Sequence, residues 1–487
     1  MRTPEGEATR RFLAAVRDPL AALADSSSAP PRYKHYPDAE RTRLPQAGRN
    51  AWKGELLYHL LGLTRLDWQY RDNTMPTAVP GTGVVRVARP VPSGGALYPI
   101  EAYLADDTAL HHYDAVHHTL ESLRDGDHRK PLLPATEAEA EAVLVLTAVF
   151  WRNGFKYRDF SYRLQCQEVG ALCAQALVLA KRLHLSASVH LEFDGERTDA
   201  LVGLDHEAES ALAVLVFRST AARPVPGTPP DLGRPVARPA QAPTPVTRLL
   251  PHLAALHAAG RRPRPAPRPP AQENPPTPTG RVLRLPRVNP PDLDQGIAHR
   301  ASPLHGYQAH PLTLEDLARI LTAALPDGPA MTGMGLFARN ITGVTPGLYH
   351  YDPDRNLITG TGRDDLDTGL FTAPTVHALR DAAAVLIPIG APLLHAATCG
   401  DTGYRLLQAE TGMRVHRASL AAAALGLAAR IHSEATNAAT DTALGLAGTP
   451  WQSLSFLLIG RPHPSGSALR CRPERKGHRP DRASPNQ

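Results

Sequence analysis

The chain has 487 residues, of which 42% are hydrophobic and 5% aromatic, and it carries 53 Lys and Arg against 47 Asp and Glu. This length can build two or three domains with aliphatic cores. No run approaches 18 apolar residues and the N-terminus lacks the apolar stretch of a signal peptide, so we expect a cytoplasmic protein without membrane contact. The positive charge is concentrated in proline-rich segments and comes with no nucleic-acid-binding motif, so no nucleic-acid partner is expected.

The first half of the chain alternates predicted helices and strands. A helix is expected over 54–63, followed by the stretch VPSGGALYPIEAYL at 91–104, which reads as a loop leading into a strand. Its two adjacent glycines would let a flat or charged group approach the backbone closely, although an ordinary glycine turn would look the same. A Tyr-Asp hairpin at 110–114 and an apolar strand at 141–150 come next. A long helix near 162–183, apolar at i, i+3, i+4 and i+7, precedes a closing strand.

Proline, alanine and arginine dominate the middle of the chain, over residues 219–295. Such a composition predicts an extended, semi-rigid linker, with one short helix within 246–260. The earlier order of elements then recurs. The helix over 313–325 has Thr313 as its expected N-cap, and the second long helix is expected near 404–425.

The two halves also match residue by residue. At a constant offset of 242, residues 162–217 align with 404–459 without a gap, and 18 of the 56 pairs are identical. Glu168/Glu410 and Gly170/Gly412 are among them. Such a long period indicates duplication of a whole domain rather than a solenoid repeat. Duplicated domains of this kind often reproduce a two-fold dimer within one chain.

The expected fold class is therefore α+β, with two tandem domains, each a mixed sheet flanked by helices, that form a pseudo-two-fold dimer. The expected divisions are an N-terminal extension at 1–44, a first domain at 45–218, the linker at 219–295, a second domain at 296–463 and a basic disordered tail at 464–487.

Cysteine and histidine give no sign of a metal site. Cys166, Cys173, Cys399 and Cys471 form no CxxC pair and match no zinc spacing, so they are expected to be reduced thiols. The hairpin stretch HHYDAVHH contains four histidines at 111–118. Neighbouring side chains on a strand point to opposite faces, so these histidines are not expected to converge on an ion.

Together, PSGGALYPIEAYL, the Tyr-Asp hairpin, FWRNGFKYRDFSYR (150–163) and the following helix resemble the flavin-dependent nitroreductase fold. More narrowly, they resemble the SagB-type azoline dehydrogenases, which make thiazoles and oxazoles in ribosomally synthesised peptides, including antibiotics. The resemblance covers most of residues 45–217. Residues 298–462 resemble the degenerate second half of tandem members.

The resemblance implies FMN as cofactor, with Ser93, Gly94 and Gly95 lining it. The catalytic residues it implies are Lys156 and Tyr157. Oxidation of an azoline removes a ring proton as well as a hydride, and the protein must provide the base for the proton. A solvated lysine beside a half-buried tyrosine is the alternative interpretation.

Nitroreductases also resemble one another in an Arg-x-Ser-x-x-x-Arg segment that binds the FMN phosphate. The second half contains HRASPLHGY, in which Arg300 and Ser302 match and His305 stands where the second Arg is expected. Arg461 lies near the place of a later basic residue. Arg300 could equally be a surface arginine after the linker, and Arg32 and Lys34 offer only a loose analogy in the first half.

The two halves retain different pieces of this pattern. At the 242 offset, Lys156 and Tyr157 align with Thr398 and Cys399, and the second half has no Pro-Ser-Gly-Gly stretch. We therefore expect one composite site, and one flavin per chain, with the loop and Lys-Tyr pair from the first half and the phosphate-binding residues from the second.

The expected activity is FMN-dependent oxidation of thiazoline or oxazoline rings in a modified precursor peptide. A cyclodehydratase that presents the peptide is a further expected partner, and the fused pair could itself dimerise. Two alternatives stay open: a general nitroreductase-like FMN oxidoreductase, and a catalytically silent scaffold subunit of a peptide-modifying complex.

Overall fold

The computed structural model describes residues 6–16, 29–45, 51–70, 83–219, 225, 237–262, 275–303, 306–325, 328, 330–366, 376, 379–433, 438–463 and 468–470. Within these ranges, helices and antiparallel sheets form two similar halves. None of the helices described is both long enough and apolar enough to cross a bilayer.

The first half is built on a seven-stranded sheet in the order β1-β6-β5-β4-β7-β9-β8. Its strands are β1 (Arg41–Arg43), β4 (Ile100–Ala105), β5 (Ala109–Asp114), β6 (Thr119–Asp125), β7 (Ala142–Val149), β8 (Ser186–His190) and β9 (Glu209–Arg218). The central strand β7 reads AVLVLTAV and is buried along its whole length, as its unbroken apolar run predicts.

The second half repeats this order with β10-β14-β13-β12-β15-β18, and β16 pairs with the outer side of β18. Its strands are β10 (Val282–Arg284), β11 (Tyr307–Gln308), β12 (Gly333–Ala338), β13 (Gly347–Asp352), β14 (Leu357–Gly360), β15 (Ala384–Gly390), β16 (Ala428–His432), β17 (Gln452–Ser453) and β18 (Phe456–Pro462). The expected α+β class with two helix-flanked sheets is confirmed, and the ladders between the named strands are antiparallel.

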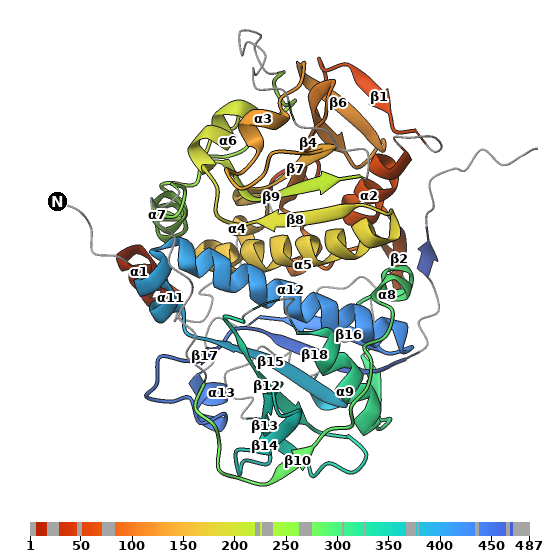
Figure 1. Ribbon diagram of the computed structural model, residues 1–487, viewed down its shortest axis with the longest axis vertical. Coiled ribbons are helices and arrows are strands. Elements are labelled where there is room, and N and C mark those ends of the chain that lie inside the picture. Colours follow the sequence, from red (N-terminus) through yellow and green to blue (C-terminus); the bar gives the residue numbers. More distant parts are fainter. Residues whose placement is uncertain are drawn as a thin grey trace, which may run out of the picture.

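Two long helices, α5 (Ser161–Arg182) and α12 (Thr402–Ala424), lie between the two sheets (Figure 1). The remaining helical segments are α1 (Glu7–Ala15), α2 (Ala51–Leu61), the 3-10 turn η2 (Gly94–Ala96), α3 (Arg129–Leu132), α4 (Trp151–Tyr157), the 3-10 turn η3 (Arg158–Phe160), α6 (Gly195–Val202), α7 (Pro251–Ala259), α8 (Leu293–His299), α9 (Leu314–Ala323), α11 (Pro392–Cys399) and α13 (Ala438–Ala443).

The contact between α5 and α12 explains the repeated glycines. A Cβ on Gly170 would lie 1.9 Å from the carbonyl oxygen of Ala409, and a Cβ on Gly412 would lie 1.9 Å from that of Gln167. The two contacts are equivalent at the 242 offset. Only glycine allows the helices to come this close, and the reciprocity is the relation that a two-fold axis between the halves would produce.

Segments outside the two expected domains also take part in the fold. β1 pairs with β6 and β10 pairs with β14, so the repeated strand order includes pieces of the extension and of the linker. α7 forms from Pro251 onward, a position where proline is favoured because the first helical N–H groups have no partner within the helix.

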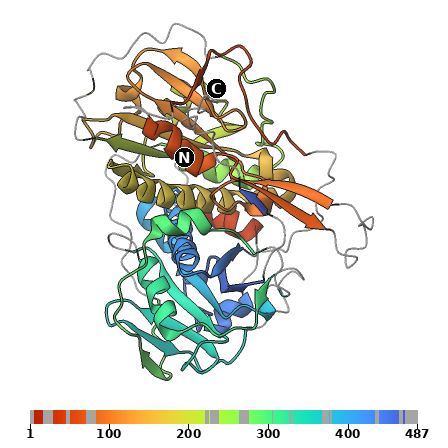
Figure 2. The ribbon, with the colours of Figure 1, turned by 90° about the vertical axis from the view of Figure 1, so that its right-hand side faces the viewer.

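Residues of the tail return to the first half. β19 (Ala468–Arg470) pairs with β2 (Arg65–Tyr70), which pairs with β3 (Gly83–Ala88) in a three-stranded sheet. Figure 2 shows the β2–β3 ribbon extending from the body of the molecule. The expectation of a disordered tail is therefore wrong for these three residues, because the unpaired edge of β2 accepts them as a strand.

A local prediction was confirmed in the second half. The Thr313 hydroxyl accepts a hydrogen bond from the amide of Asp316 at the start of α9, as the N-cap pattern predicts. The second half also has a strand, β12, that is equivalent to β4. β12 pairs with β13 and β15 as β4 pairs with β5 and β7, although its sequence lacks the YPIEAY pattern.

Candidate functional site

The Pro-Ser-Gly-Gly loop is tightly folded. Gly95, Ala96 and Tyr98 all have positive φ values, of 65°, 54° and 51°. The Ser93 hydroxyl oxygen accepts a hydrogen bond of 2.8 Å from the Tyr98 amide and closes the loop on itself. Positive φ is unfavourable for the two residues with side chains, so the surrounding contacts must hold this conformation.

The loop meets the Lys-Tyr pair at Gly95. A Cβ at this position would lie 2.7 Å from the Tyr157 hydroxyl and 3.3 Å from the Lys156 Nζ. The Lys156 Nζ also lies 5.1 Å from the centre of the Tyr157 ring. The structure therefore brings together the two motifs that sequence analysis singled out 60 residues apart, and glycine is required where they meet.

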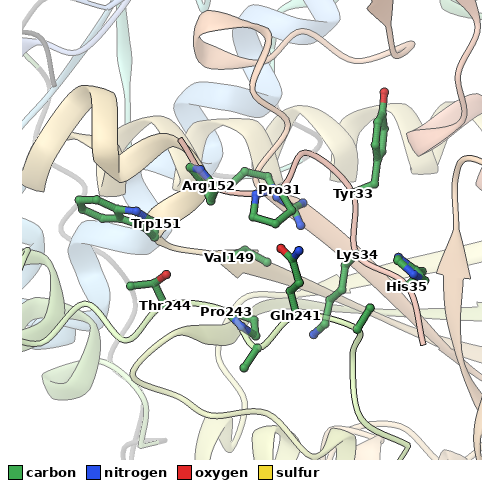
Figure 3. Close-up of a pocket in the computed structure, with 13 residues that line it drawn as sticks. Pro31, Tyr33, Lys34, His35, Val149, Trp151, Arg152, Gln241, Pro243 and Thr244 are labelled. Atoms are coloured by element: carbon green, nitrogen blue, oxygen red, sulfur yellow. The ribbon is translucent and has the colours of Figure 1, made fainter. Parts of the chain in front are cut away.

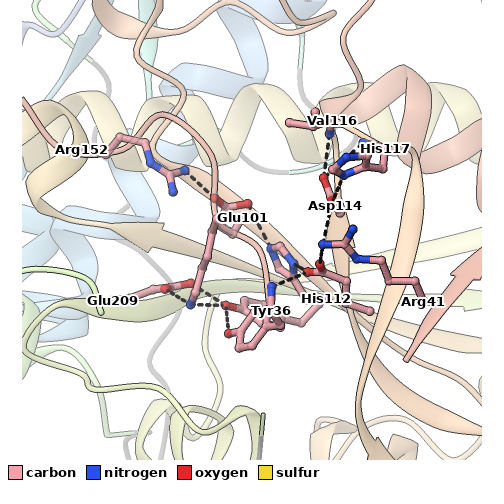
Figure 4. Close-up of polar contacts among 12 residues, drawn as sticks. Tyr36, Arg41, Glu101, His112, Asp114, Val116, His117, Arg152 and Glu209 are labelled. Carbon is pink, nitrogen blue, oxygen red and sulfur yellow. Dashed lines mark hydrogen bonds and ion pairs between the residues drawn. The ribbon is translucent and has the colours of Figure 1, made fainter. Parts of the chain in front are cut away.

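A buried arginine fastens the loop to the start of α4. The Arg152 Nη1 donates to the carbonyl oxygen of Tyr98 at 3.0 Å and pairs with the Glu101 carboxylate at 2.6 Å. Figure 4 shows how Glu101 continues to His112, which also contacts Glu121 at 2.9 Å. Burial alone would lower the pKa of His112, but the two carboxylates outweigh it and raise the pKa. These contacts fix both ends of the loop–α4 junction.

Glu168 lies on α5 beside the loop. Burial raises the pKa of its carboxyl group to about 8, in spite of opposing hydrogen bonds from the Ser93 hydroxyl and the Gly94 amide. Its Oε2 atom is buried and has no hydrogen-bond partner among the described residues. The loop therefore rests on an acid that is largely protonated at neutral pH.

Arg300, from the second half, reaches the same loop. Its side chain is only 8% exposed, and its Nε donates to the carbonyl oxygen of Pro90 at 2.7 Å. It also lies within electrostatic range of Tyr98. Arg300 is therefore a buried residue at the base of the loop and not a surface arginine. Ser302, two residues on, is half-buried.

Arg461 and His305 are less clearly placed. Arg461 is exposed near the end of β18, where its guanidinium lies 3.3 Å from the His310 imidazole, and Gln308 pairs with it across the sheet. It therefore adjoins the strand that follows Ser302 and makes no hydrogen bond to the described residues of the loop. His305 lies outside the described residues.

Several residues here fit a flavin. Gly94 and Gly95 let the Leu164 side chain and the Tyr157 hydroxyl approach the loop backbone, to 3.1 Å and 2.7 Å from where a Cβ would stand. The buried Glu168 Oε2, which has no hydrogen-bond partner among the described residues, could bond a polar edge. From the second half, Arg300 adds a guanidinium at the base of the loop, where its Nε donates to the Pro90 carbonyl oxygen, and this is the group type that binds phosphate. Ser93, Gly94, Gly95 and Arg300 are the residues of this loop region at which a flavin would be held.

The corresponding place in the second half lacks this chemistry. The Thr398 hydroxyl donates to the Leu394 carbonyl oxygen within α11, and Cys399 is buried. Cys166 and Cys173 are likewise free and buried, and burial raises the pKa of each thiol to about 12, while Cys471 lies outside the described residues. No acid–base pair replaces Lys156 and Tyr157 among these residues.

A pocket of about 150 Å³ lies at the other end of α4 (Figure 3). It is lined by the N-terminal segment around Tyr33 and Lys34, by Trp151 and Arg152, and by the linker around Gln241. The Lys34 Nζ is paired with Glu209 at 2.5 Å and is buried, so Lys34 does not serve as a phosphate ligand. Arg32 is exposed.

Sequence analysis missed Arg152 and Glu168. A signal for Glu168 was present, since its pairing with Glu410 in the duplication was visible. Arg152 lies inside the quoted FWRNGFKY motif, but nothing in the sequence indicated that its partner would be Glu101, 51 positions earlier.

Comparison with known proteins relates part of this chain to a family and the whole of it to a fold. A family model described as "Nitroreductase family" matches residues 70–217, so this part of the chain is a nitroreductase-family domain. A crystal structure of a protein from Anabaena variabilis, provisionally described as a nitroreductase, superposes with a TM-score of 0.75 over 95% of this chain and 100% of that one, at 20% identity. The tandem fold is thus shared with a solved structure.

Two curated relatives match parts of the chain. The microcin B17-processing protein McbC of Escherichia coli is 28% identical over 154 residues, which cover 28% of this chain and 56% of McbC. The trifolitoxin-processing protein TfxB of Rhizobium leguminosarum bv. trifolii is 30% identical over 142 residues, which cover 26% of this chain and 38% of TfxB. The chain thus spans about half or less of the length of these relatives.

Proposed function

We propose that this protein is an FMN-dependent dehydrogenase that oxidises thiazoline or oxazoline rings in a modified precursor peptide. The observation that carries the proposal is the contact of Gly95 with the Lys156 amine and the Tyr157 hydroxyl. Similarity to the processing proteins of microcin B17 and trifolitoxin supports a role in maturation of a product of this kind.

Each residue of the proposed site would have a separate role in the reaction. Bound FMN would supply the acceptor for the hydride that leaves the ring. Lys156 would take the ring proton on its Nζ, and the Tyr157 hydroxyl beside it would orient the amine or pass the proton on. Gly95 lets the Lys156 amine and the Tyr157 hydroxyl lie against the loop that would contact the cofactor, and Arg152 holds the loop against α4.

The phosphate would be held from the other half of the chain. Arg300 is already placed at Pro90, and Ser302 and Arg461 are the further candidates. We therefore propose one composite site, built from both halves, and about one FMN per chain. A modified precursor peptide is the proposed substrate, and a cyclodehydratase is a proposed partner.

The first test is the visible spectrum of the purified chain, with the released flavin measured against protein. We expect about one FMN per chain, and oxygen-dependent conversion of a thiazoline peptide to the thiazole with a mass loss of two hydrogens. Two flavins per chain would contradict the composite site. A colourless chain that binds no added FMN would favour a silent scaffold.

Lys156→Ala then separates this activity from general flavin chemistry. We expect the rate of azoline oxidation to fall about 10²-fold or more, because the base is lost, while flavin content is unchanged. Lys181→Ala, which removes an exposed lysine on α5, should have no effect. If Lys156→Ala kept full azoline oxidation, the proton-removal role would be wrong. Reduction of nitro compounds without azoline oxidation would favour the general nitroreductase alternative.

A further inference from the structure

Arg158, the residue after the Lys-Tyr pair, has a backbone conformation that is normally reserved for glycine. Its φ and ψ angles are 51° and −146°. The equivalent residue in the second half is Gly400, with φ 63° and ψ −165°. A side chain in this region strains the backbone. The fold therefore requires this turn in both halves, and the first half carries an arginine there at a cost in stability.

Contacts within the fold give no reason for the arginine. Its side chain is exposed, and no described residue accepts a hydrogen bond from its guanidinium or forms an ion pair with it. The next residue, Asp159, accepts a hydrogen bond of 2.7 Å from the Leu253 amide, at the start of α7. This contact fixes the backbone on one side of Arg158, and α4 fixes it on the other. The backbone of Arg158 is therefore held on both sides, directly after Tyr157, and its charged side chain is exposed there.

We propose that Arg158 is a substrate-binding residue that binds a carboxylate of the substrate beside the Lys156–Tyr157 site. An arginine can grip a carboxylate through two parallel hydrogen bonds, which gives both affinity and orientation. An exposed positive group in this position would also attract an acidic peptide. The inference rests on the proposed function for its choice of a peptide substrate, and it names an acidic residue close to the azoline ring as the recognised feature.

Three variants separate binding from backbone strain. Arg158→Ala removes the charge and keeps a side chain in the strained conformation. Arg158→Gly removes the charge and relieves the strain, as Gly400 does in the second half. Arg158→Lys keeps a positive charge but cannot form two parallel hydrogen bonds to a carboxylate. If the arginine had only a structural role, Arg158→Gly would improve stability and leave substrate binding unchanged.

The experiment uses the full chain with bound FMN and a fluorescent thiazoline peptide with Asp beside the ring, together with its Asn counterpart. Fluorescence anisotropy measures binding, and thermal denaturation measures stability. We expect Arg158→Ala and Arg158→Gly to weaken binding of the Asp peptide about 10-fold, and to change binding of the Asn peptide less than 2-fold. Arg158→Lys should be intermediate. The Tm of Arg158→Gly should rise by about 2–5 °C.

Two results would overturn the proposal. One is equal binding of the Asp peptide by the wild type and by Arg158→Ala. The other is loss of FMN from Arg158→Ala, which would assign the guanidinium to the cofactor phosphate. Because binding is measured without turnover, a wild type that discriminates Asp from Asn through Arg158 but oxidises neither peptide would contradict the proposed function alone.

Discussion

The two halves of the chain differ most clearly where α4 leads into α5 and where α11 leads into α12. Both junctions keep an aspartate that anchors an additional helix. Asp159 accepts from Leu253 of α7, and Asp401 accepts from the amide and the hydroxyl of Thr9 of α1, both at 2.7 Å. Only the first junction carries Lys156 and Tyr157. Both halves therefore keep the structural contact at this junction. Only the first half has the lysine and the tyrosine proposed as acid–base residues.

A second difference concerns the glutamate that supports the loop. Glu410 accepts hydrogen bonds from the Met331 and Thr332 amides and from the Thr332 hydroxyl. Glu168 instead has a buried oxygen without a partner among the described residues, and burial raises its pKa to about 8. The same residue is thus a satisfied structural group in one half and an incompletely bonded one in the half with the proposed site.

The largest expected effect tests what the halves share. Gly170→Ala and Gly412→Ala should each lower the free energy of unfolding by about 3 kcal/mol or more, because the added Cβ would force α5 and α12 apart. Alanine favours an isolated helix by about 1 kcal/mol over glycine, so the loss would come from the crossing alone. Denaturant titration measures it.

Gly260→Ala is the control, since its Cβ would make only an ordinary contact of 3.4 Å with Thr402. Its free energy of unfolding should change by less than about 0.5 kcal/mol. Unequal losses for Gly170→Ala and Gly412→Ala would contradict the reciprocal crossing of the two helices.

The next effect tests the two glutamates. Glu410→Gln should cost about 2 kcal/mol, because an amide cannot accept all the hydrogen bonds that the carboxylate receives. Glu168→Gln should raise the free energy of unfolding at pH 7 and not lower it, because glutamine resembles the protonated acid and releases no proton on unfolding. Denaturant titration of both variants in the same buffer compares them, and equal losses would mean that the two glutamates have the same role.

The pH dependence sharpens this contrast. The pKa of Glu168 rises from 4.5 to about 8 on folding, so the folded chain binds an extra proton between these values. Its contribution to stability is complete below pH 4.5 and is lost as the pH rises toward 8, by at most about 1.4 kcal/mol per pH unit. Unfolding measured at pH 5, 6, 7 and 8 should show this slope in the wild type and in Glu410→Gln. Glu168→Gln should reduce it.

The smallest effect tests the two anchoring aspartates. Asp401→Ala should weaken the docking of α1, and Asp159→Ala that of α7, each by about 1 kcal/mol. Hydrogen exchange should report faster exchange in the helix concerned and no change in the other. Each variant is the other's control, and faster exchange in both helices from one variant would show that α1 and α7 unfold together.

The sequence was sufficient for the repeated elements because their signals are local. The unbroken apolar run of β7 and the N-cap at Thr313 each act within a few residues. The duplication predicted the relation between the halves. The contact between Gly95 and Tyr157 could only be proposed through the family resemblance, because it joins segments that are distant along the chain.

Three findings were beyond local patterns. Arg152 forms an ion pair with Glu101 only because the fold brings α4 close to β4. The tail residues 468–470 form a strand because β2 offers a free edge, which no property of the tail itself indicates. The strained turn at Arg158 is invisible in composition and becomes evident when its angles are set beside those of Gly400.

Fusion of the halves has a consequence for how such a site can evolve. In a homodimer every substitution appears in both subunits, so a strained residue such as Arg158 would cost stability twice. Here each half changes alone, and the covalent link keeps the partners together at an effective concentration that dilution cannot lower. One half is therefore free to serve as a permanent structural partner while the other accumulates changes that suit a single substrate.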